Sequence, residues 1–310
     1  MSLSIGVDVG GTKIAAGVVD ETGEIVERVR YSTPATDVEA IAETIANAVR
    51  DLAGAGVTSV GIGAAGYVSS DRSTVLFAPN LSWRNEPLGQ RVSELAGVNV
   101  VVENDANAAA WGEYRFGAAA HTQSAAVVTI GTGVGGGIIT GGHLVRGRGG
   151  FGGEFGHLNV IPDGPLCGCG SRGCWEALAS GTALTRYAVE RTTADPRGGA
   201  AILAYGNGEA TGLAVTQAAH DGDAMALGIF DTVAHYTAVG IADLVTLLDP
   251  EMVVLAGGVS EAGNILLDPV VEKLPDVLPV SDFRPAPPVR LATLGNDAGI
   301  IGAADLAREG

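Results

Sequence analysis

A strand–turn–strand pattern that occurs twice places the strongest constraint on how this chain can fold. In the first copy, two apolar segments flank Gly10 and Gly11, and a third extended segment follows a polar turn. In the second copy, similar segments flank the glycine-rich turn GTGVGGG. The predicted strands are 3–9, 13–19 and 24–30 in the first copy, and 124–130, 138–140 and 143–146 in the second. Because helices and buried strands follow each copy, we predict a duplicated α/β fold whose ligands bind in a cleft between the halves.

The segments after each copy have the periodicities of helices and buried strands. Apolar residues recur at helical spacing between 37 and 53, which predicts an amphipathic helix that Asp37 can cap. The apolar stripe consists of Val38, Ile41, Ile45, Val49 and Leu52. Further helices are predicted at 105–114, 225–248 and 299–308, strands at 57–64, 99–103 and 252–255, and a proline-rich connection at 275–288.

The first turn, DVGGTK, has a composition suited to phosphate binding. Gly10 and Gly11 let the backbone approach a phosphate closely, and the N–H groups of the turn can point at it. Thr12 adds a hydroxyl donor, Lys13 adds a positive charge, and Asp8 can hold Mg²⁺ through water. A Walker A loop is excluded because its residue order is absent and a strand follows instead of a helix. The alternative is an ordinary tight hairpin, which this combination of residues disfavours.

The second turn contains Gly131, Gly133 and Gly136 at the spacing of G-x-G-x-x-G. A dinucleotide-binding fingerprint must open a helix, whereas this chain is expected to continue as a hairpin, so we exclude that interpretation. The match is weak evidence by itself. Together with the first turn, it predicts two phosphate loops that face each other across the cleft.

Asp105 lies where a strand ends and a helix begins, in the run Glu103-Asn104-Asp105. A carboxylate held at the mouth of a sheet can accept a hydroxyl proton. Its alternative role is that of helix N-cap, which would be preferred if the two phosphate loops were absent. Asn80, in the loop Pro-Asn-Leu-Ser-Trp, is either a hydrogen-bonding group for sugar hydroxyls or a turn residue with positive φ.

All three cysteines of the chain lie between residues 167 and 174. Three thiolates and one imidazole form a closed tetrahedral set for Zn²⁺, with no position open for water, which predicts a structural site. Three cysteines cannot all pair, so a disulfide scaffold is excluded. The predicted zinc ligands are His157, Cys167, Cys169 and Cys174. Zinc does not need Glu154 or Glu176, so we expect these acids, and the second ring nitrogen of His157, to serve a ligand.

Composition excludes several classes of partner. A net charge of -17 disfavours nucleic acid and anionic membranes. We expect no membrane span, because no apolar run approaches the roughly 20 residues that one needs. The start, MSLSIGVDVGG, lacks the charged region of a signal peptide, so none is expected. Free thiols that bind metal fit a reducing compartment, which predicts a cytoplasmic location.

The order of these motifs resembles that of the ROK family of bacterial sugar kinases, above all the glucokinases among them. The resemblance covers essentially the whole chain, and its most specific part is the cysteine block that follows GEFGH. The motifs that carry it are DVGGTK, Pro79-Asn80-Leu81, Glu103-Asn104-Asp105, GTGVGGG, Gly153-Glu154-Phe155-Gly156-His157, CGCGSRGCWE and Leu255-Ala256-Gly257-Gly258.

The resemblance implies the actin-like ATPase fold, which is ribonuclease H-like and of the hexokinase type. We expect a small N-terminal domain, 1–117 plus the returning helix at 297–310, and a large domain, 118–296, that carries the zinc loop. The implied reaction transfers the γ-phosphoryl of ATP to the 6-hydroxyl of glucose, with Mg²⁺ and structural Zn²⁺ bound and Asp105 as the catalytic base. The implied sugar-binding residues are Gly66, Asn80, Asn104, Asp105, Glu154, His157 and Glu176. The implied nucleotide-binding residues are Asp8, Gly10, Gly11, Thr12, Lys13, Gly131, Thr132, Gly133, Gly257 and Gly258.

The sequence departs from the family pattern at Ala64-Ala65-Gly66-Tyr67, where many members carry proline before the glycine. Family members that are repressors carry a DNA-binding helix-turn-helix, which is not expected here because the sequence opens on the first strand. Alternative functions are a kinase for N-acetylglucosamine, N-acetylmannosamine or fructose, a non-catalytic sugar sensor, and a chaperone- or actin-like ATPase. An intact Asp105 disfavours a sensor, and the zinc loop disfavours the other ATPases. The resemblance also implies a homodimer or homotetramer.

Overall fold

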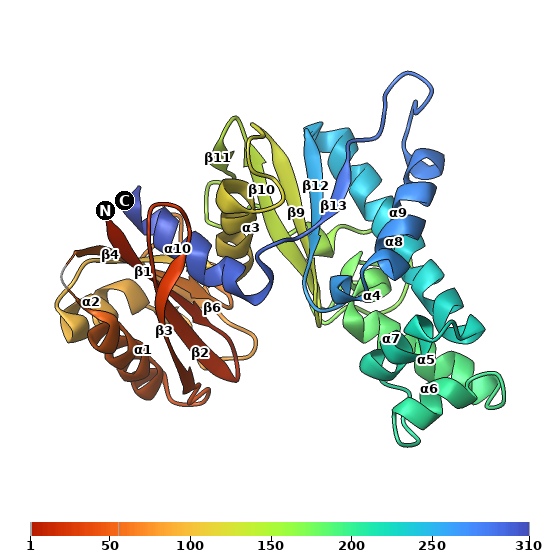
Figure 1. Ribbon diagram of the computed structural model, residues 1–310, viewed down its shortest axis with the longest axis horizontal. Coiled ribbons are helices and arrows are strands. Elements are labelled where there is room, and N and C mark those ends of the chain that lie inside the picture. Colours follow the sequence, from red (N-terminus) through yellow and green to blue (C-terminus); the bar gives the residue numbers. More distant parts are fainter. Residues whose placement is uncertain (1, 55, 310) are drawn as a thin grey trace. The chain divides into compact units, whose positions relative to one another are not determined.

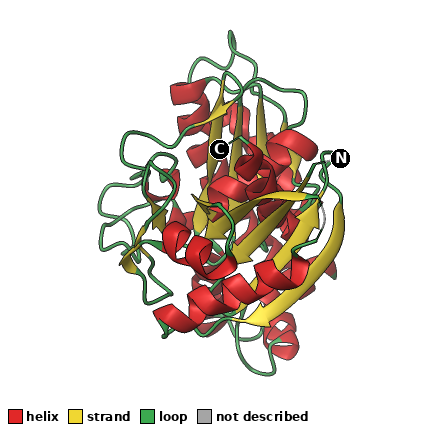
Figure 2. Ribbon diagram, turned by 90° about the vertical axis from the view of Figure 1, so that its left-hand side faces the viewer, coloured by secondary structure: helices red, strands yellow, loops and turns green. Residues whose placement is uncertain are grey.

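The computed structural model describes residues 2–54 and 56–309, which form both helices and strands (Figure 1; Figure 2). The contacts between residues divide the chain into two compact units. Unit 1 consists of Met1–Ala125, Gly136–Gly153 and Ala292–Gly310, and unit 2 of Ala126–Gly135 and Glu154–Leu291. The domain boundaries predicted from the sequence, 1–117 plus 297–310 and 118–296, remain a prediction.

The first sheet has five strands in the order β3-β2-β1-β4-β8. Its strands are β1 (Leu3–Val9), β2 (Lys13–Val19), β3 (Ile25–Ser32), β4 (Val57–Ala64) and β8 (Val100–Asn104). β2 pairs antiparallel with β1 and β3, whereas β4 pairs parallel with β1 and β8. Val9 lies opposite Ala64, and Ala64 lies opposite Asn104. The carboxyl ends of the three parallel strands therefore meet at one edge.

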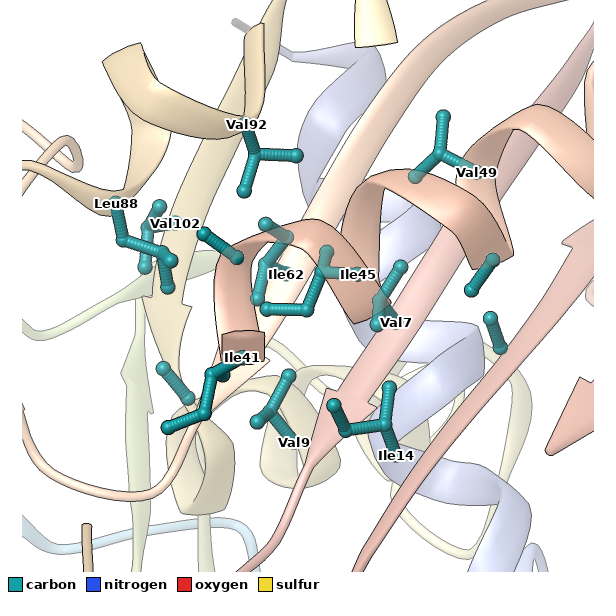
Figure 3. Close-up of a cluster of buried hydrophobic side chains, with 14 of the residues drawn as sticks. Val7, Val9, Ile14, Ile41, Ile45, Val49, Ile62, Leu88, Val92 and Val102 are labelled. Carbon is teal, nitrogen blue, oxygen red and sulfur yellow. The ribbon is translucent and has the colours of Figure 1, made fainter. Parts of the chain in front are cut away.

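Helix α1 (Val38–Leu52) covers one face of this sheet, next to α2 (Leu88–Ala96). Its predicted cap is confirmed, because the Asp37 side chain accepts hydrogen bonds from the backbone N of Glu39 and of Ala40. The predicted stripe is also confirmed, with Val38 only partly buried. Apolar side chains of this core converge from α1, α2 and the strands (Figure 3), among them Val7, Val9, Ile14, Ile41, Ile45, Val49, Ile62, Leu88, Val92 and Val102.

The other face of the sheet carries α3 (Asp105–Phe116) and α10 (Ala298–Arg308). α10 lies directly on the backbone of β1 and β4, where two glycines leave room for it. A Cβ added to Gly6 would lie 1.8 Å from the carbonyl oxygen of Ile300, and one added to Gly61 would lie 1.9 Å from that of Ala303. Any larger residue at either glycine would force the helix off the sheet.

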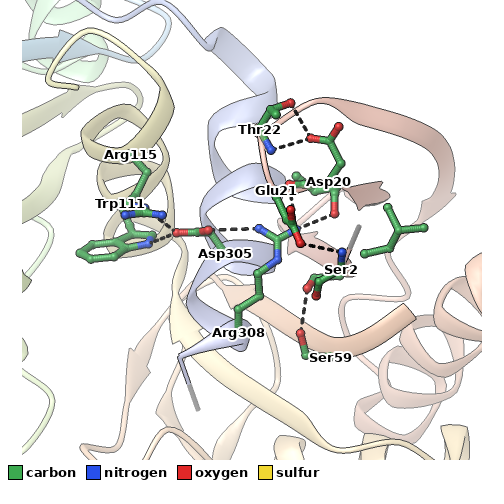
Figure 4. Close-up of polar contacts among 12 residues, drawn as sticks. Ser2, Asp20, Glu21, Thr22, Ser59, Trp111, Arg115, Asp305 and Arg308 are labelled. Carbon is green, nitrogen blue, oxygen red and sulfur yellow. Dashed lines mark hydrogen bonds and ion pairs between the residues drawn. The ribbon is translucent and has the colours of Figure 1, made fainter. Parts of the chain in front are cut away.

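Polar contacts fix α10 to α3 and to β2 (Figure 4). The buried carboxylate of Asp305 accepts hydrogen bonds from Trp111 Nε1 and Arg115 Nε, both at 2.9 Å. Arg308 donates to the same carboxylate at 3.1 Å and to the carbonyl oxygen of Val19 at 2.6 Å. The C-terminal helix is thereby part of the unit that the N-terminal strands build.

A small antiparallel sheet follows β4 in unit 1. Its strands, in the order β5-β6-β7, are β5 (Tyr67–Val68), β6 (Val75–Phe77) and β7 (Arg84–Glu86). Each has two or three residues, too few for a period-2 pattern, and the sequence analysis did not predict them.

The second sheet has the order β11-β10-β9-β12-β13, which repeats that of the first. Its strands are β9 (Ala125–Ile130), β10 (Val134–Thr140), β11 (His143–Leu144), β12 (Met252–Ala256) and β13 (Val289–Leu291). The repeated order confirms the predicted duplicated α/β fold. The predicted turn at 131–137 was too long, since β10 already begins at Val134. Gly137 lies within this strand. A glycine is needed there because a Cβ would lie 2.6 Å from that of Ala110 in α3.

Unit 2 is rich in helices that the sequence analysis only partly predicted. They are α4 (Glu176–Ala179), α5 (Gly181–Ala194), α6 (Ala200–Tyr205), α7 (Gly212–His220), α8 (Ala224–Leu248) and α9 (Asn264–Val277), and single 3-10 turns occur at η1 (Phe155–His157), η2 (Ser260–Ala262) and, in unit 1, η3 (Gly295–Asp297). The predicted connection at 275–288 starts too early, because α9 continues through Pro275 to Val277. Its buried Leu266, Val270 and Leu274 form a helical stripe that holds it in place.

Helix α8 corrects the expectation that no segment approaches a membrane span. It is long and apolar enough to cross a membrane by length and composition, although Asp231 and Asp243 interrupt it. Half of its most apolar window is buried inside the structure, and it packs against α4, α5, α7 and α9. These properties are those of a core helix.

Candidate active site

The carboxyl edge of the first sheet brings together Asn104 and the backbone at Gly66. Asn104 ends β8, and its Oδ1 accepts a hydrogen bond from the N of Asn107 at 2.9 Å, so Asn104 is the N-cap of α3. Its Nδ2 donates to the carbonyl oxygen of Gly66 at 3.0 Å. The amide side chain therefore ties the start of α3 to the loop after β4.

Asp105 is the first residue of α3. Its Oδ1 accepts hydrogen bonds from the N of Ala106 at 2.9 Å and from Asn104 Nδ2 at 3.1 Å. Because Asn104 already serves as the cap, helix capping does not account for the aspartate. Two donors fix the orientation of this carboxylate at the edge where the parallel strands end.

Gly66 has a backbone conformation that other residues rarely adopt. Its φ is 153°, and a Cβ there would lie 2.4 Å from the carbonyl oxygen of Phe77. The preceding residue explains the departure from the family pattern. The N of Ala65 donates to the carbonyl oxygen of Val9 at 3.3 Å, a hydrogen bond that proline cannot make.

The first glycine turn is closed by the N of Gly10, which donates to the carbonyl oxygen of Lys13 at 3.0 Å. Thr33, the residue after β3, supports it by donating to the carbonyl oxygens of Gly10 and Thr12 at 2.7 Å and 3.1 Å. A Cβ on Gly10 or Gly11 would meet only ordinary contacts of 3.5 Å or more, and neither residue has positive φ. The fold of the turn therefore does not itself require a glycine at either position.

Two polar residues flank this turn. The Cβ of Asn80 lies 3.6 Å from the Cβ position of Gly11. Asp8 is the last residue but one of β1, and its carboxyl group lies against Gly299 in the first turn of α10. Burial raises the pKa of Asp8, and the positive charge of Lys13 offsets part of this rise. A cation next to Asp8 would favour its ionised form further.

Unit 2 contains a pocket of about 550 Å³ next to the second glycine turn. Its lining comes from the turn, the first turns of α5 and α7, and the segment after β12. The residues are Gly131, Thr132, Gly181, Thr182, Leu184, Thr185, Gly212, Leu213, Thr216, Gly258, Val259 and Glu261. The structure thus brings three predicted nucleotide residues, Gly131, Thr132 and Gly258, to one pocket. Sequence reasoning missed the α5 wall, although Ser180-Gly181-Thr182 has the form of a helix start.

Residues at the start of α5 hold the second turn in place. The N of Gly181 donates to the carbonyl oxygen of Gly131 at 2.8 Å, and Thr182 donates through its side chain to that of Thr132 at 2.7 Å. Gly133 lies away from the pocket lining, and a Cβ there would fall 2.2 Å from Glu176 Oε2.

Gly257 also lies outside the pocket lining, and its role is packing. Its φ is 87°, and a Cβ there would lie 2.6 Å from the carbonyl oxygen of Ile130 at the end of β9. The neighbouring Val259 donates its N to the same carbonyl oxygen at 2.9 Å. Gly257 therefore sets how closely the segment after β12 approaches the second turn.

The donor atoms of the four predicted zinc ligands, His157, Cys167, Cys169 and Cys174, all lie within 4.8 Å of one another. The sulfurs of Cys169 and Cys174 are 3.7 Å apart, as are Nδ1 of His157 and the sulfur of Cys167. A tetrahedron with Zn–S bonds of about 2.3 Å has edges of about 3.8 Å, so the residues fit a zinc ion. Nearby, Trp175 packs its buried ring on α8 at Gly240, which anchors the segment in unit 2.

The thiols of this cluster have different environments. Burial raises the pKa of Cys167 to about 12 and also raises that of Cys174. A backbone hydrogen bond from Ser171 lowers the pKa of Cys169, which is exposed. Metal binding at such a cluster must release protons, so its affinity for zinc is expected to rise with pH.

Two predicted sugar-binding acids lie beside the cluster. Glu176 begins α4, with Oε1 at 3.3 Å from the sulfur of Cys167 and Oε2 accepting a hydrogen bond from the N of Val134 at 3.1 Å. It therefore connects the cysteine segment to the second glycine turn. Glu154 precedes the single 3-10 turn that contains His157. Partial burial of its carboxyl group raises the pKa of Glu154, while His157 lowers it.

A comparison with known families matches residues 4–310 to the ROK family. The chain is 50% identical to a glucokinase of Streptomyces coelicolor, over 100% of this chain and 98% of that protein. Among solved structures, a ROK family glucokinase from Streptomyces griseus, in complex with glucose and AMPPNP, is 51% identical, covers 100% of both chains and has a TM-score of 0.88. A ROK hexokinase from Thermus thermophilus is 36% identical over 99% of this chain and 98% of that one, with a TM-score of 0.82. These similarities confirm the predicted actin-like ATPase fold class.

Proposed function

Because the chain belongs to the ROK family, we propose that it is a glucokinase, which transfers the γ-phosphoryl of ATP to the 6-hydroxyl of glucose and releases ADP. The observation that carries this proposal is the identity of 50% with a glucokinase along the entire chain. The complex of the Streptomyces griseus glucokinase with glucose and AMPPNP, an imido analogue of ATP, supports the pair of substrates.

Asp105 is proposed as the general base. It accepts the proton of the glucose 6-hydroxyl while that oxygen forms a bond to the γ-phosphorus, and the electron pair of the breaking bond goes to ADP. Two hydrogen bonds to Oδ1 orient the carboxylate for this role. Asn80 and Asn104, the backbone at Gly66, Glu154, His157 and Glu176 are proposed to bind sugar hydroxyls, because amide, carboxylate and imidazole groups hydrogen-bond them readily.

The two glycine turns are proposed to hold the triphosphate. Gly10 and Gly11 give it close access to backbone N–H groups, Thr12 and Lys13 add a hydroxyl and a charge, and Gly131, Thr132 and Gly133 form the second turn. The pocket next to the second turn would receive the adenosine, with Gly258 in its lining and Gly257 next to it in the chain. Its volume of about 550 Å³ is that of a small-molecule site. Bound Mg²⁺, held through water by Asp8, would neutralise charge on the phosphates.

The cysteine cluster is proposed to hold a structural Zn²⁺. Four protein donors leave no position for water, so His157, Cys167, Cys169 and Cys174 would fix a segment and take no part in the chemistry. Free thiols in such a site support a cytoplasmic location. A homodimer or homotetramer, and the two domains at 1–117 plus 297–310 and 118–296, are proposed from the family resemblance.

The similarity to a hexokinase keeps a second candidate open, a kinase for another hexose. ADP release from Mg-ATP should be measured across glucose, mannose, fructose, N-acetylglucosamine and N-acetylmannosamine. Turnover with the highest kcat/KM for glucose supports the proposal, and turnover only with another sugar keeps the kinase and replaces the substrate. Sugar binding with no ADP release would contradict both in favour of a sensor.

A further inference from the structure

A buried carboxylate that the proposed reaction does not use lies two residues before Asp105. Glu103 is only 4% exposed, at the end of β8, and both of its oxygens are engaged. A charged side chain in such a place needs a compensating partner, because an unpaired buried charge is strongly unfavourable. The identity of those partners indicates what the residue does.

One oxygen of Glu103 holds the start of α3. Its Oε1 accepts hydrogen bonds from the N of Asn104 at 3.0 Å and from Nδ2 of Asn107 at 3.2 Å. The N of Asn107 in turn donates to Oδ1 of Asn104. Glu103 thus contacts both residues of the capping interaction that sets the first turn of the helix, where Asp105 lies.

The other oxygen binds arginine. Arg146 Nε lies 2.6 Å from Oε2 of Glu103, and Arg72 Nε lies 3.8 Å from it. Both arginines are largely buried, with side-chain exposures of 25% and 18%. Buried Arg72 Nε and Arg146 Nη2 have no hydrogen-bond partner among the described residues. Two cations therefore share the charge of Glu103, and Glu309 adds a further negative charge near Arg72.

We propose that Glu103 is a positioning residue for the catalytic base, which keeps Arg72 and Arg146 away from Asp105 and holds the first turn of α3. The inference rests on the proposed kinase function. If the carboxylate of Glu103 were neutral, Arg146 would lose the carboxylate that it contacts, and Arg72 would keep the charge of Glu309. The carboxylate of Asp105 lies two residues along the chain, and an ion pair between it and Arg146 would rotate it away from the substrate hydroxyl.

The central test is Glu103→Gln, which keeps the shape and removes the charge. We expect kcat to fall on the order of 10²-fold, as a misplacement of about 1 Å does, with the KM for ATP unchanged. Glu86→Gln is the matched control, because Glu86 is 7% exposed and its Oε1 is 2.7 Å from Arg91 Nε in the same unit. This control should lose thermal stability to a similar degree and keep kcat.

The decisive variant is the double change Glu103→Gln with Arg146→Met. It removes one anion and one cation, so the charge of the cluster returns to its native value, and we expect it to recover at least tenfold of the lost kcat. If the single variant does not fold, the double variant and Arg146→Met alone carry the test, with kcat expected within tenfold of the native protein. A merely structural role predicts that the second substitution lowers stability and kcat further.

These outcomes are separable from the function itself. If the native chain releases no ADP with any hexose, the proposed kinase function fails. If the native chain is active and Glu103→Gln matches Glu86→Gln in kcat, the positioning role is wrong. The same conclusion follows if kcat falls but Arg146→Met gives no recovery.

Discussion

The two glycine turns occupy equivalent positions in two sheets of the same strand order, yet they are held in different ways. The first turn is supported by Thr33, which directly follows the adjacent strand, and carries charged neighbours, Asp8 and Lys13. The second is supported by distant residues, Glu176 and the start of α5, and lines a pocket whose only charged residue is Glu261. The two halves therefore share a strand order but differ in their turns. The first turn has charged neighbours, and the second lines a pocket.

The largest expected effect lies at the charged edge of unit 1. Asp105→Asn should lower kcat by on the order of 10²–10⁴-fold, because general-base help is lost, while glucose binding stays nearly intact. A steady-state assay of ADP release measures kcat, and calorimetric titration with glucose measures the binding affinity. Loss of glucose affinity in parallel with kcat would mean that Asp105 is structural, and the proposed division of roles would break.

Zinc removal tests whether the second turn depends on its distant support. Cys169→Ser, with loss of zinc verified by metal analysis, should raise the KM for glucose on the order of 10- to 100-fold, which is the usual cost of disturbing the surroundings of a metal site. The KM for ATP should rise too, because Glu176 joins the cysteine segment to the N of Val134. A metal-free variant with unchanged KM values would show that the cluster does not shape either site.

A pair of glycine substitutions compares the turns directly. Gly133→Ala should destabilise unit 2 by about 1–3 kcal/mol, since its Cβ displaces the carboxylate of Glu176. Gly10→Ala should leave the unfolding free energy within about 0.5 kcal/mol, yet raise the KM for ATP roughly tenfold, as loss of about 1.4 kcal/mol of binding does. Thermal unfolding measures the change in stability, and kinetics at varied ATP concentration measure the KM for ATP. Equal stability losses in both variants would remove the distinction between the turns.

The smallest effect concerns Asp8. Burial raises the folded-state pKa of Asp8 above the ordinary value of 3.8, so folding favours the protonated form. The stability that this form contributes is fully present below pH 3.8 and is lost as the pH rises through the folded-state pKa. Asp8→Asn should therefore raise Tm at neutral pH by a few degrees, lose this gain below about pH 3.8, and lower turnover. A variant that is less stable than the native chain at pH 7 would show that the carboxylate stabilises unit 1.

Local patterns predicted the elements whose stabilising residues are close in sequence. Asp37 and an apolar stripe predicted α1, and β1 and β2, the strands on either side of the first glycine turn, begin and end where expected. Helix α9 was not predicted, and 275–288 was expected to be a connection because of its prolines, whereas a buried stripe keeps the helix intact through Pro275. The cysteine cluster was predictable because its ligands lie within one segment.

The residues that sequence reasoning missed act through distant partners. Arg146 becomes significant only when folding brings it 2.6 Å from Glu103, and no local pattern marks that contact. The bridge from Glu176 to the second turn spans 42 residues for the same reason. Motifs thus predicted which side chains carry chemistry, and tertiary structure was needed to find what orients them.

The packing of α10 on Gly6 and Gly61 has a consequence for biosynthesis. The sheet of unit 1 is complete in sequence once β8 has left the ribosome, but one of its faces is covered by α10, which is synthesised after the whole of Glu154–Leu291. At about 5–20 residues per second, the intervening chain takes on the order of tens of seconds to synthesise. During that interval the face formed by Ala15 and Val19 lacks the cover that α10 gives it, so unit 1 completes its folding only after α10 has been synthesised.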